Sequence, residues 1–196
     1  MYTVLAALMT AVAALLGYWL TYRNNIHLAQ RAERLQRVNR QLGEFYGPML
    51  AISSIGQRIF HDYRRSLMSR EHSEPPDTAD PEFRAWMKSV FMPNNERLYD
   101  LILTKADLLV DDQMPECLLQ LSAHVAAFRA IMHRWEENDY EVEIPPVPFP
   151  KDLFNYARDR FYLLRREQRN LMKALGQAPE ELPTTAVEYI EPPSGR

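Results

Sequence analysis

The chain opens with an unbroken apolar stretch, because residues 2–22 contain no charged side chain. About 20 such residues, rising 1.5 Å each, make a helix of about 30 Å, which matches the hydrocarbon core of a bilayer. Aromatic side chains, which favour the headgroup layer, cluster at the end of this stretch, and Arg23 follows directly. We therefore expect residues 1–22 to form a transmembrane anchor. The residues expected at the lipid or headgroup level are Tyr18, Trp19, Tyr22, Arg23, Arg31 and Arg34.

Other interpretations of the apolar stretch fit the sequence less well. A cleaved signal peptide needs basic residues before its apolar region, and only the amino terminus precedes this one. The small-residue triplet 11–13 resembles a cleavage site but lies inside the stretch, and a buried core helix rarely lacks charge over such a length. Between residues 23 and 40, five arginines stand against one acid, Glu33. The positive-inside rule then predicts a single-pass protein of the bacterial inner membrane, with its amino terminus outside and its carboxyl terminus in the cytoplasm.

Apolar residues continue at helical spacing after Arg23, which predicts an amphipathic juxtamembrane helix over residues 23–46. Gly47-Pro48 should kink or end it, because proline lacks a backbone donor. We expect a cytosolic helical domain over 47–176 and a flexible acidic tail over 177–196. The apolar positions of the juxtamembrane helix are Leu28, Ala32, Leu35, Val38, Leu42 and Phe45.

The remaining pattern predicts an all-α fold, with a bundle of five or six helices following the anchor. The expected helices run from about 48 to 70, from Asp80-Pro81, from beyond Pro93-Asn94, from 115 to 137 and from 151 to 175. The helix at 115–137 has the most regular apolar spacing, so we expect it at the centre of the core. Its seam consists of Leu118, Leu121, Val125, Phe128, Met132 and Trp135.

Charge is segregated along a chain whose net charge is −3. Residues 23–70 carry nine arginines against three acids, whereas residues 71–112 carry ten acids against four bases. A nucleic-acid-binding protein is more often basic overall, so we expect membrane lipids, an unidentified protein and possible homo-oligomers as partners, and no nucleic acid. The single cysteine, Cys117, allows no intrachain disulfide and fits a reducing compartment.

The histidines offer the main candidates for chemistry. His124 lies at the edge of the central seam, which favours a core histidine bonded to a neighbour. His133 and Glu137 are one helical turn apart, a spacing that could hold a metal, but their side of the helix is polar and no HExxH motif is present. The acids Asp107, Asp111 and Asp112 lack the spacing of a calcium loop and are expected to cap the helix that follows.

Two short motifs resemble those of all-helical enzymes. His61-Asp62 has the doublet of the HD phosphohydrolases, and Arg65 with His72 has the Arg–His spacing of the HEPN ribonucleases. Such short matches arise by chance in a chain this rich in arginine. Phosphate loops, nucleophile elbows and CxxC pairs are absent from the sequence. We therefore expect a protein without enzymatic activity and without a cofactor or metal.

Three longer segments carry a resemblance that covers most of the chain. They are residues 45–50 (FYGPML), 90–95 (VFMPNN) and 114–119 (MPECLL). Together they resemble uncharacterised bacterial single-pass membrane proteins with a helical cytosolic domain. This resemblance implies a location in the inner membrane and implies no particular activity.

The favoured function is a membrane-tethered interaction or sensor module that acts through protein contacts on the cytoplasmic side. A membrane-perturbing effector of a bacterial defence or toxin system is the alternative, on architecture alone, and a helical nuclease or phosphohydrolase is a third. Small residues spaced by four also give the anchor one face suited to close helix packing. The residues expected in anchor self-association are Ala6, Thr10, Ala14 and Gly17.

Overall fold

The computed structural model describes residues 2–68, 80–140 and 147–177 of the chain. The side chains of residues 1–8, 10, 11 and 13 also lie outside the described set. Every regular element in the described ranges is helical, and they contain no β-strand. The all-α prediction is therefore confirmed, whereas the predicted tail beyond Gln177 falls outside the described residues.

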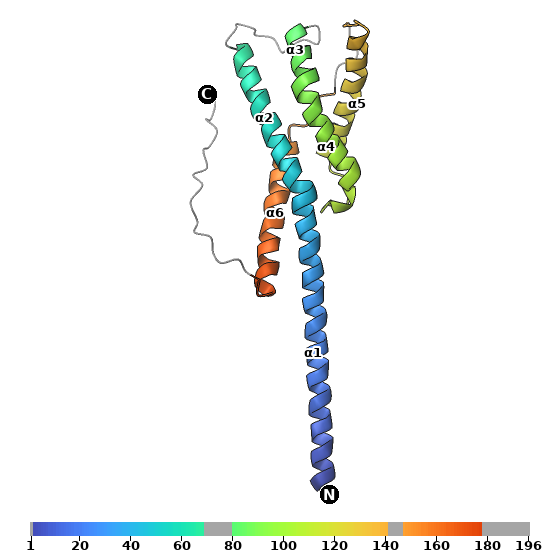
Figure 1. The fold of residues 1–196 in the computed structure, drawn as a ribbon, viewed down its shortest axis with the longest axis vertical. Helices are drawn as coiled ribbons and strands as arrows, with labels where there is room; N and C mark the ends of the chain where they lie inside the picture. The colour runs from blue at the N-terminus through green and yellow to red at the C-terminus, as the bar shows by residue number, and fades with distance from the viewer. Residues whose placement is uncertain (1, 69–79, 141–146, 178–196) are drawn as a thin grey trace. The chain divides into compact units, whose positions relative to one another are not determined.

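The described residues form four continuous helical segments (Figure 1). The first consists of α1 (Tyr2–Arg40), the π-helical turn η1 (Gln41–Tyr46) and α2 (Gly47–Met68). The second consists of α3 (Pro81–Trp86), the π-helical turn η2 (Met87–Phe91), α4 (Met92–Lys105) and the 3₁₀ turn η3 (Ala106–Leu108). The third is α5 (Glu116–Glu136), and the fourth is α6 (Leu153–Ala174).

The expectation of five or six bundle helices is wrong, because neither predicted break at a proline ends a helix. Each proline directly follows the residue that closes a π turn. The Gly47 N–H donates to the carbonyl of Leu42, and the Met92 N–H donates to the carbonyl of Met87, five residues back in both cases. This wider turn displaces the carbonyl that a proline ring would otherwise strike, so the chain stays helical through Pro48 and Pro93.

The first π turn leaves no room for a side chain at Gly47. A β-carbon at this position would lie 2.5 Å from the carbonyl oxygen of Leu42. We expect Gly47→Ala to lower the free energy of unfolding by about 1–3 kcal/mol, because the backbone must shift to admit the methyl group. Urea unfolding of the full chain in detergent measures this change.

The matched control for this substitution is Gly56→Ala in α2, where an added β-carbon would meet no atom within 4 Å. Alanine has the higher helix propensity, so this change should raise the free energy of unfolding by up to about 1 kcal/mol. Effects of equal sign and size at Gly47 and Gly56 would contradict a close approach at η1.

Two predicted helix ends are confirmed. The Asp80 carboxylate accepts a hydrogen bond of 2.9 Å from the Glu82 N–H, with Pro81 in the first helical position of α3. At the end of α6, Gly176 adopts a φ of 69°, a left-handed conformation that glycine takes at little cost. The Gln177 N–H then donates to the Met172 carbonyl, which completes a common C-terminal cap.

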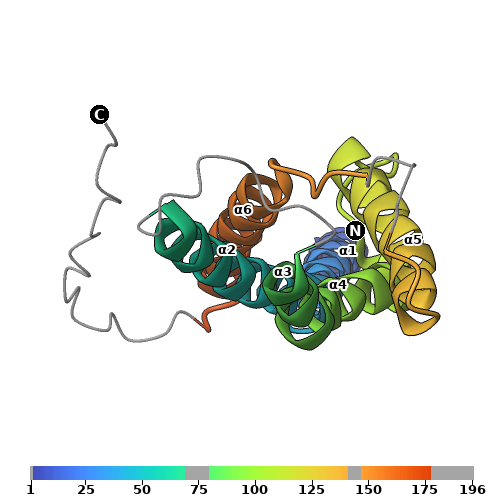
Figure 2. The ribbon, with the colours of Figure 1, turned by 90° about the horizontal axis from the view of Figure 1, so that it is seen from above.

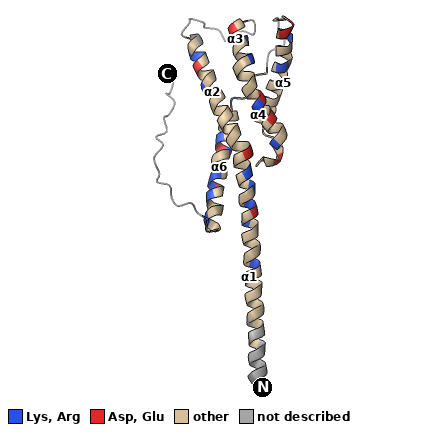
Figure 3. Cartoon of the chain, in the orientation of Figure 1, with Lys and Arg blue, Asp and Glu red and all other residues tan. Residues whose placement is uncertain are grey.

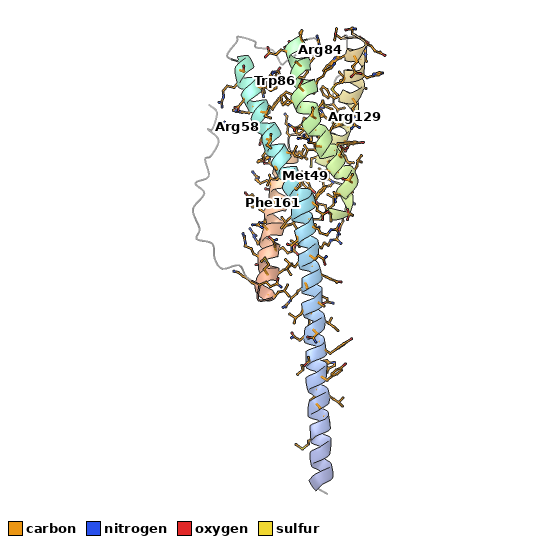
Figure 4. All side chains as sticks on the ribbon, in the orientation of Figure 1. Met49, Arg58, Arg84, Trp86, Arg129 and Phe161 are labelled. Carbon is orange, nitrogen blue, oxygen red and sulfur yellow. The ribbon has the colours of Figure 1, made fainter. Side chains whose placement is uncertain are left out.

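The chain divides into two compact units, here called unit 1 (Met1–Glu33 with Arg169–Arg196) and unit 2 (Arg34–Gln168). In unit 2, α4 contacts both α2 and α5 (Figures 1 and 2). Within the same unit, α6 runs antiparallel to the end of α1, because Arg34 pairs with Glu167 whereas Tyr46 meets Tyr156. Fully buried apolar side chains of unit 2 include Val38, Phe45, Tyr46, Met49 (Figure 4), Leu118, Leu121, Val125, Leu153, Ala157 and Leu164.

The apolar seam of α5 is buried as its sequence predicts, but the predicted central place in unit 2 belongs to α4, which contacts α2, η1 and α5. All predicted seam residues except Met132 are buried, and Ile131 is buried in its place. The buried stripe follows 3.6 residues per turn, so a strict heptad drifts away from it along the helix. Ala123, Ala126 and Ala130 on the reverse side are exposed, so a second helix does not cover them within the described residues.

Among the described residues, no helix is both long enough and apolar enough to cross a bilayer. Most side chains of residues 1–13, which form more than half of the predicted anchor, lie outside that set.

Candidate functional site

An exposed apolar surface occupies α1 from residue 15 to residue 22, and we call it the apolar collar. At least half of each of its large side chains is accessible to solvent, from 50% for Trp19 to 72% for Tyr18. The Tyr18 and Tyr22 rings stack with centroids 6.3 Å apart, and the Arg23 guanidinium lies 5.0 Å from the Trp19 ring. The collar consists of Leu15, Leu16, Tyr18, Trp19, Leu20 and Tyr22.

The predicted headgroup arginines differ in their contacts. Arg23 and Arg31 are exposed and have no carboxylate partner among the described residues. Arg34 instead holds Glu167 through two hydrogen bonds, of 2.6 and 3.1 Å. Arg34 therefore fixes α1 against α6 within unit 2, a role that the sequence did not indicate.

The predicted small-residue face of the anchor is described only in part. The side chains of Ala6 and Thr10 lie outside the described residues. Ala14 and Gly17 are exposed, and a β-carbon at Gly17 would meet no atom within 4 Å. Self-association through this face remains a prediction.

A directed chain of hydrogen bonds crosses unit 2. The buried Tyr46 hydroxyl of η1 accepts a bond of 3.1 Å from the Val110 N–H and lies 3.1 Å from the Tyr156 hydroxyl. Tyr156 donates to Asp111 at 2.8 Å, so the proton between the two tyrosine oxygens belongs to Tyr46. The other Asp111 oxygen accepts from Arg160. We call these four side chains the tyrosine–aspartate network.

The tyrosine–aspartate network joins η1, the segment before α5 and α6. Burial raises the pKa of both tyrosine hydroxyls, which keeps them protonated as donors at neutral pH. The carboxylate of Asp111 is bound at both oxygens, an arrangement in which charge-assisted bonds fix relative position. The network therefore holds η1, the segment before α5 and α6 in fixed positions relative to one another.

Sequence reasoning missed this network and assigned its acid wrongly. Helix α5 begins after Pro115, which makes no side-chain capping bond, so Asp111 does not cap it. Asp107 lies in η3, 3.6 Å from the Arg40 guanidinium, and not at the start of α5. Tyr156 and Arg160 are four residues apart on α6, which places them on one face, but no local pattern connects them with a residue 45 positions earlier.

His124 is a buried core histidine bonded to its neighbours, as predicted. Its Nδ1 lies 2.6 Å from the Val147 carbonyl oxygen, which can only accept, so Nδ1 carries the hydrogen. Its Nε2 lies 3.1 Å from the Asn95 amide nitrogen and accepts from it. The ring also packs against Phe128 and Phe149. This neutral imidazole ties α4 and α5 to the segment before α6.

We expect the stability of unit 2 to fall in mild acid because of His124. Burial lowers the pKa of His124 in the folded chain, and the bond to Val147 offsets this only in part. The unfolded chain therefore binds a proton first as the pH falls below about 6.5, which favours unfolding. The expected slope is at most about 1.4 kcal/mol per pH unit.

Urea unfolding at pH 7.5 and pH 5.5 measures this effect, with His124→Gln as the comparison. The variant should be less stable at pH 7.5 but should lose less stability between the two pH values than the unaltered chain. An identical pH dependence in the two proteins would show that His124 does not titrate as described.

The other candidate residues do not assemble a site among the described residues. His133 lies 3.7 Å from Glu136 and 3.9 Å from Glu137, on a solvated face where these side chains are about 70% exposed. His61 and Asp62 are exposed on α2, and His72 lies outside the described residues. The described ranges hold no group of three or more His, Cys, Asp or Glu side chains arranged to bind a metal ion.

Comparisons with known proteins assign no family and no function to the chain. No family model, no curated protein and no solved structure matches the chain. The resemblance to bacterial single-pass membrane proteins therefore stays a prediction.

Proposed function

We propose that the chain is a membrane-tethered helical module that acts through protein contacts on the cytoplasmic side of the membrane. The observation that carries the proposal is the apolar collar, in which six large side chains in eight consecutive positions are at least half exposed. Contiguous exposed apolar surface of this kind is typical of a membrane or protein contact. Its aromatic end, followed by Arg23, fits the interface of a bilayer.

The course of α1 supports a tether that carries a domain. The same helix that bears the collar also contributes Leu35 and Val38 to the core of unit 2. The helix Tyr2–Arg40 therefore holds both the collar and these two core positions. Unit 2 in turn presents Ile55, Leu103 and Leu119, each at least 50% exposed, as apolar contacts for a protein partner.

Alkaline extraction of membranes from cells that express the full chain tests the tether. We expect the unaltered chain to stay in the membrane pellet. Leu16→Arg should release part of it, because arginine inside a span is costly, up to about 2.5–3.5 kcal/mol at its centre. Leu119→Arg, an equally exposed leucine on α5, is the matched control and should stay in the pellet. Complete release of the unaltered chain would refute the proposal.

A further inference from the structure

The outer face of α6 carries four basic side chains, which we call the basic stripe. With 100° per residue, they fall within an arc of about 100° and extend over about 12 Å of helix. All four are exposed (Figure 3 shows the basic residues of α6 in blue). The basic stripe consists of Arg165, Arg166, Arg169 and Lys173.

The basic stripe lacks the carboxylate partners that other basic residues of α6 have. Arg160 binds Asp111, and Arg158 binds Asp159 at 3.0 Å. In the stripe, Arg165 contacts only the amide oxygen of Gln168, at 2.8 Å, and no residue of the stripe pairs with an acid among the described residues. Glu167, the acid nearest in sequence, is taken by Arg34. Like charges one turn apart repel each other, so the stripe is unbalanced within the described chain.

The end of the stripe belongs to the same compact unit as the apolar collar. Arg169 and Lys173 fall in unit 1, together with residues 1–33. The direction of α6 agrees with this grouping, because it runs antiparallel to α1 where Arg34 meets Glu167.

We propose that the basic stripe binds the anionic headgroups of phospholipids in the membrane that holds the anchor. This inference rests on the proposed function, since a tether is needed to bring α6 to the bilayer. Lys173 belongs to the same unit as the collar, and an anionic surface acts on basic side chains within a Debye length, about 8 Å at physiological ionic strength. Each basic residue near such a surface strengthens binding about fivefold.

Lipid fits the stripe better than nucleic acid does. The chain as a whole has a net charge of −3, which opposes a polyanion that approaches from solution. A membrane surface already adjacent to the collar needs no approach from solution. Tyr162 is the one aromatic side chain on the exposed face beside the stripe, and stacking platforms for bases use several.

The test follows the chemical reactivity of Lys173 in the full chain held in lipid nanodiscs. Acetylation of each lysine is followed by mass spectrometry in discs of phosphatidylcholine alone and in discs with 30% phosphatidylglycerol. Lys88 and Lys151 are exposed lysines outside the stripe and serve as internal references. We expect Lys173 to react about fivefold more slowly in the anionic discs, with the two references unchanged.

Charge variants identify the cause of this protection. Arg165→Gln/Arg166→Gln/Arg169→Gln should restore the reactivity of Lys173 in anionic discs. The matched triple variant Arg58→Gln/Arg64→Gln/Arg65→Gln removes as many exposed arginines from α2 and should leave the protection intact. Protection that survives loss of the stripe arginines would overturn the inference.

Other outcomes also decide the matter. Equal reactivity of Lys173 in the two lipid compositions would overturn the inference and leave the tether standing. Equal protection by inorganic phosphate, or by a single-stranded oligonucleotide added to phosphatidylcholine discs, would replace lipid with a free phosphate or a nucleic acid. Failure of the chain to enter either kind of disc would overturn the proposed function and this inference together.

Discussion

Trp135→Ala is expected to lower the free energy of unfolding by about 3–5 kcal/mol. Trp135 is 2% exposed at the end of the α5 seam, so removal of the indole leaves a cavity in unit 2. A loss of this size approaches the whole stability of many domains. Urea unfolding of the full chain in detergent, followed by circular dichroism, measures it.

Two further variants show whether the loss comes from the cavity. Leu119→Ala on the same helix changes a side chain that is 50% exposed, so its effect should stay within about 0.5 kcal/mol. Trp135→Phe should cost less than Trp135→Ala, because the phenyl ring fills part of the cavity. Neither change breaks a hydrogen bond, since the buried indole N–H has no partner. Equal losses for Trp135→Ala and Leu119→Ala would show that the α5 seam is not part of the core of unit 2.

The second large effect is expected from Asp111→Ala in the tyrosine–aspartate network. The change leaves the Arg160 guanidinium and the Tyr156 hydroxyl without their acceptor. Loss of a partly buried, charge-assisted acceptor typically costs about 1–3 kcal/mol. The Asp111 and Arg160 side chains are 20% and 37% exposed, which favours the lower half of that range.

The neighbouring exposed residue provides the control for Asp111. Asp112→Ala removes the same charge one position along and should change stability by less than about 0.5 kcal/mol. In a double-mutant cycle, Asp111→Ala and Arg160→Ala should be coupled, because each removes the same contact. Additive effects of the two changes would show that the network does not join α6 to the segment before α5.

The helices were predictable where local signals decide them. The cap at Asp80, the end at Gly176 and the seam of α5 follow from residues a few positions apart. The predicted breaks at Pro48 and Pro93 were wrong because a proline ring clashes with the preceding turn only in a regular α-helix. A π turn before each of these prolines removes the clash. A π turn adds one residue to a helical turn, and the spacing of apolar residues in the sequence does not reveal this addition.

The candidate site was predictable in its exposed part and not in its interior. Composition alone identifies the collar, since hydrophobic and aromatic residues around Trp19 are contiguous. The partners of Asp111 and Arg34 come from α6, more than forty and more than one hundred and thirty positions later, respectively. Such pairings depend on tertiary packing, to which one sequence gives no direct access. The basic stripe can be distinguished from the other basic residues of α6 only when their carboxylate partners are known.

The most direct test of the tether is the location of the carboxyl terminus. Alkaline phosphatase, which is active only after export, and green fluorescent protein, which is fluorescent in the cytoplasm, are each fused after Arg196. We expect fluorescence without phosphatase activity, because positive charge after the anchor holds the domain inside. Arg23→Glu/Arg31→Glu/Arg37→Glu, which spares the Arg34–Glu167 pair, should shift part of the population outward. Phosphatase activity in the unaltered fusion, or fluorescence that is soluble after cell lysis, would contradict a cytoplasmic domain on a membrane anchor.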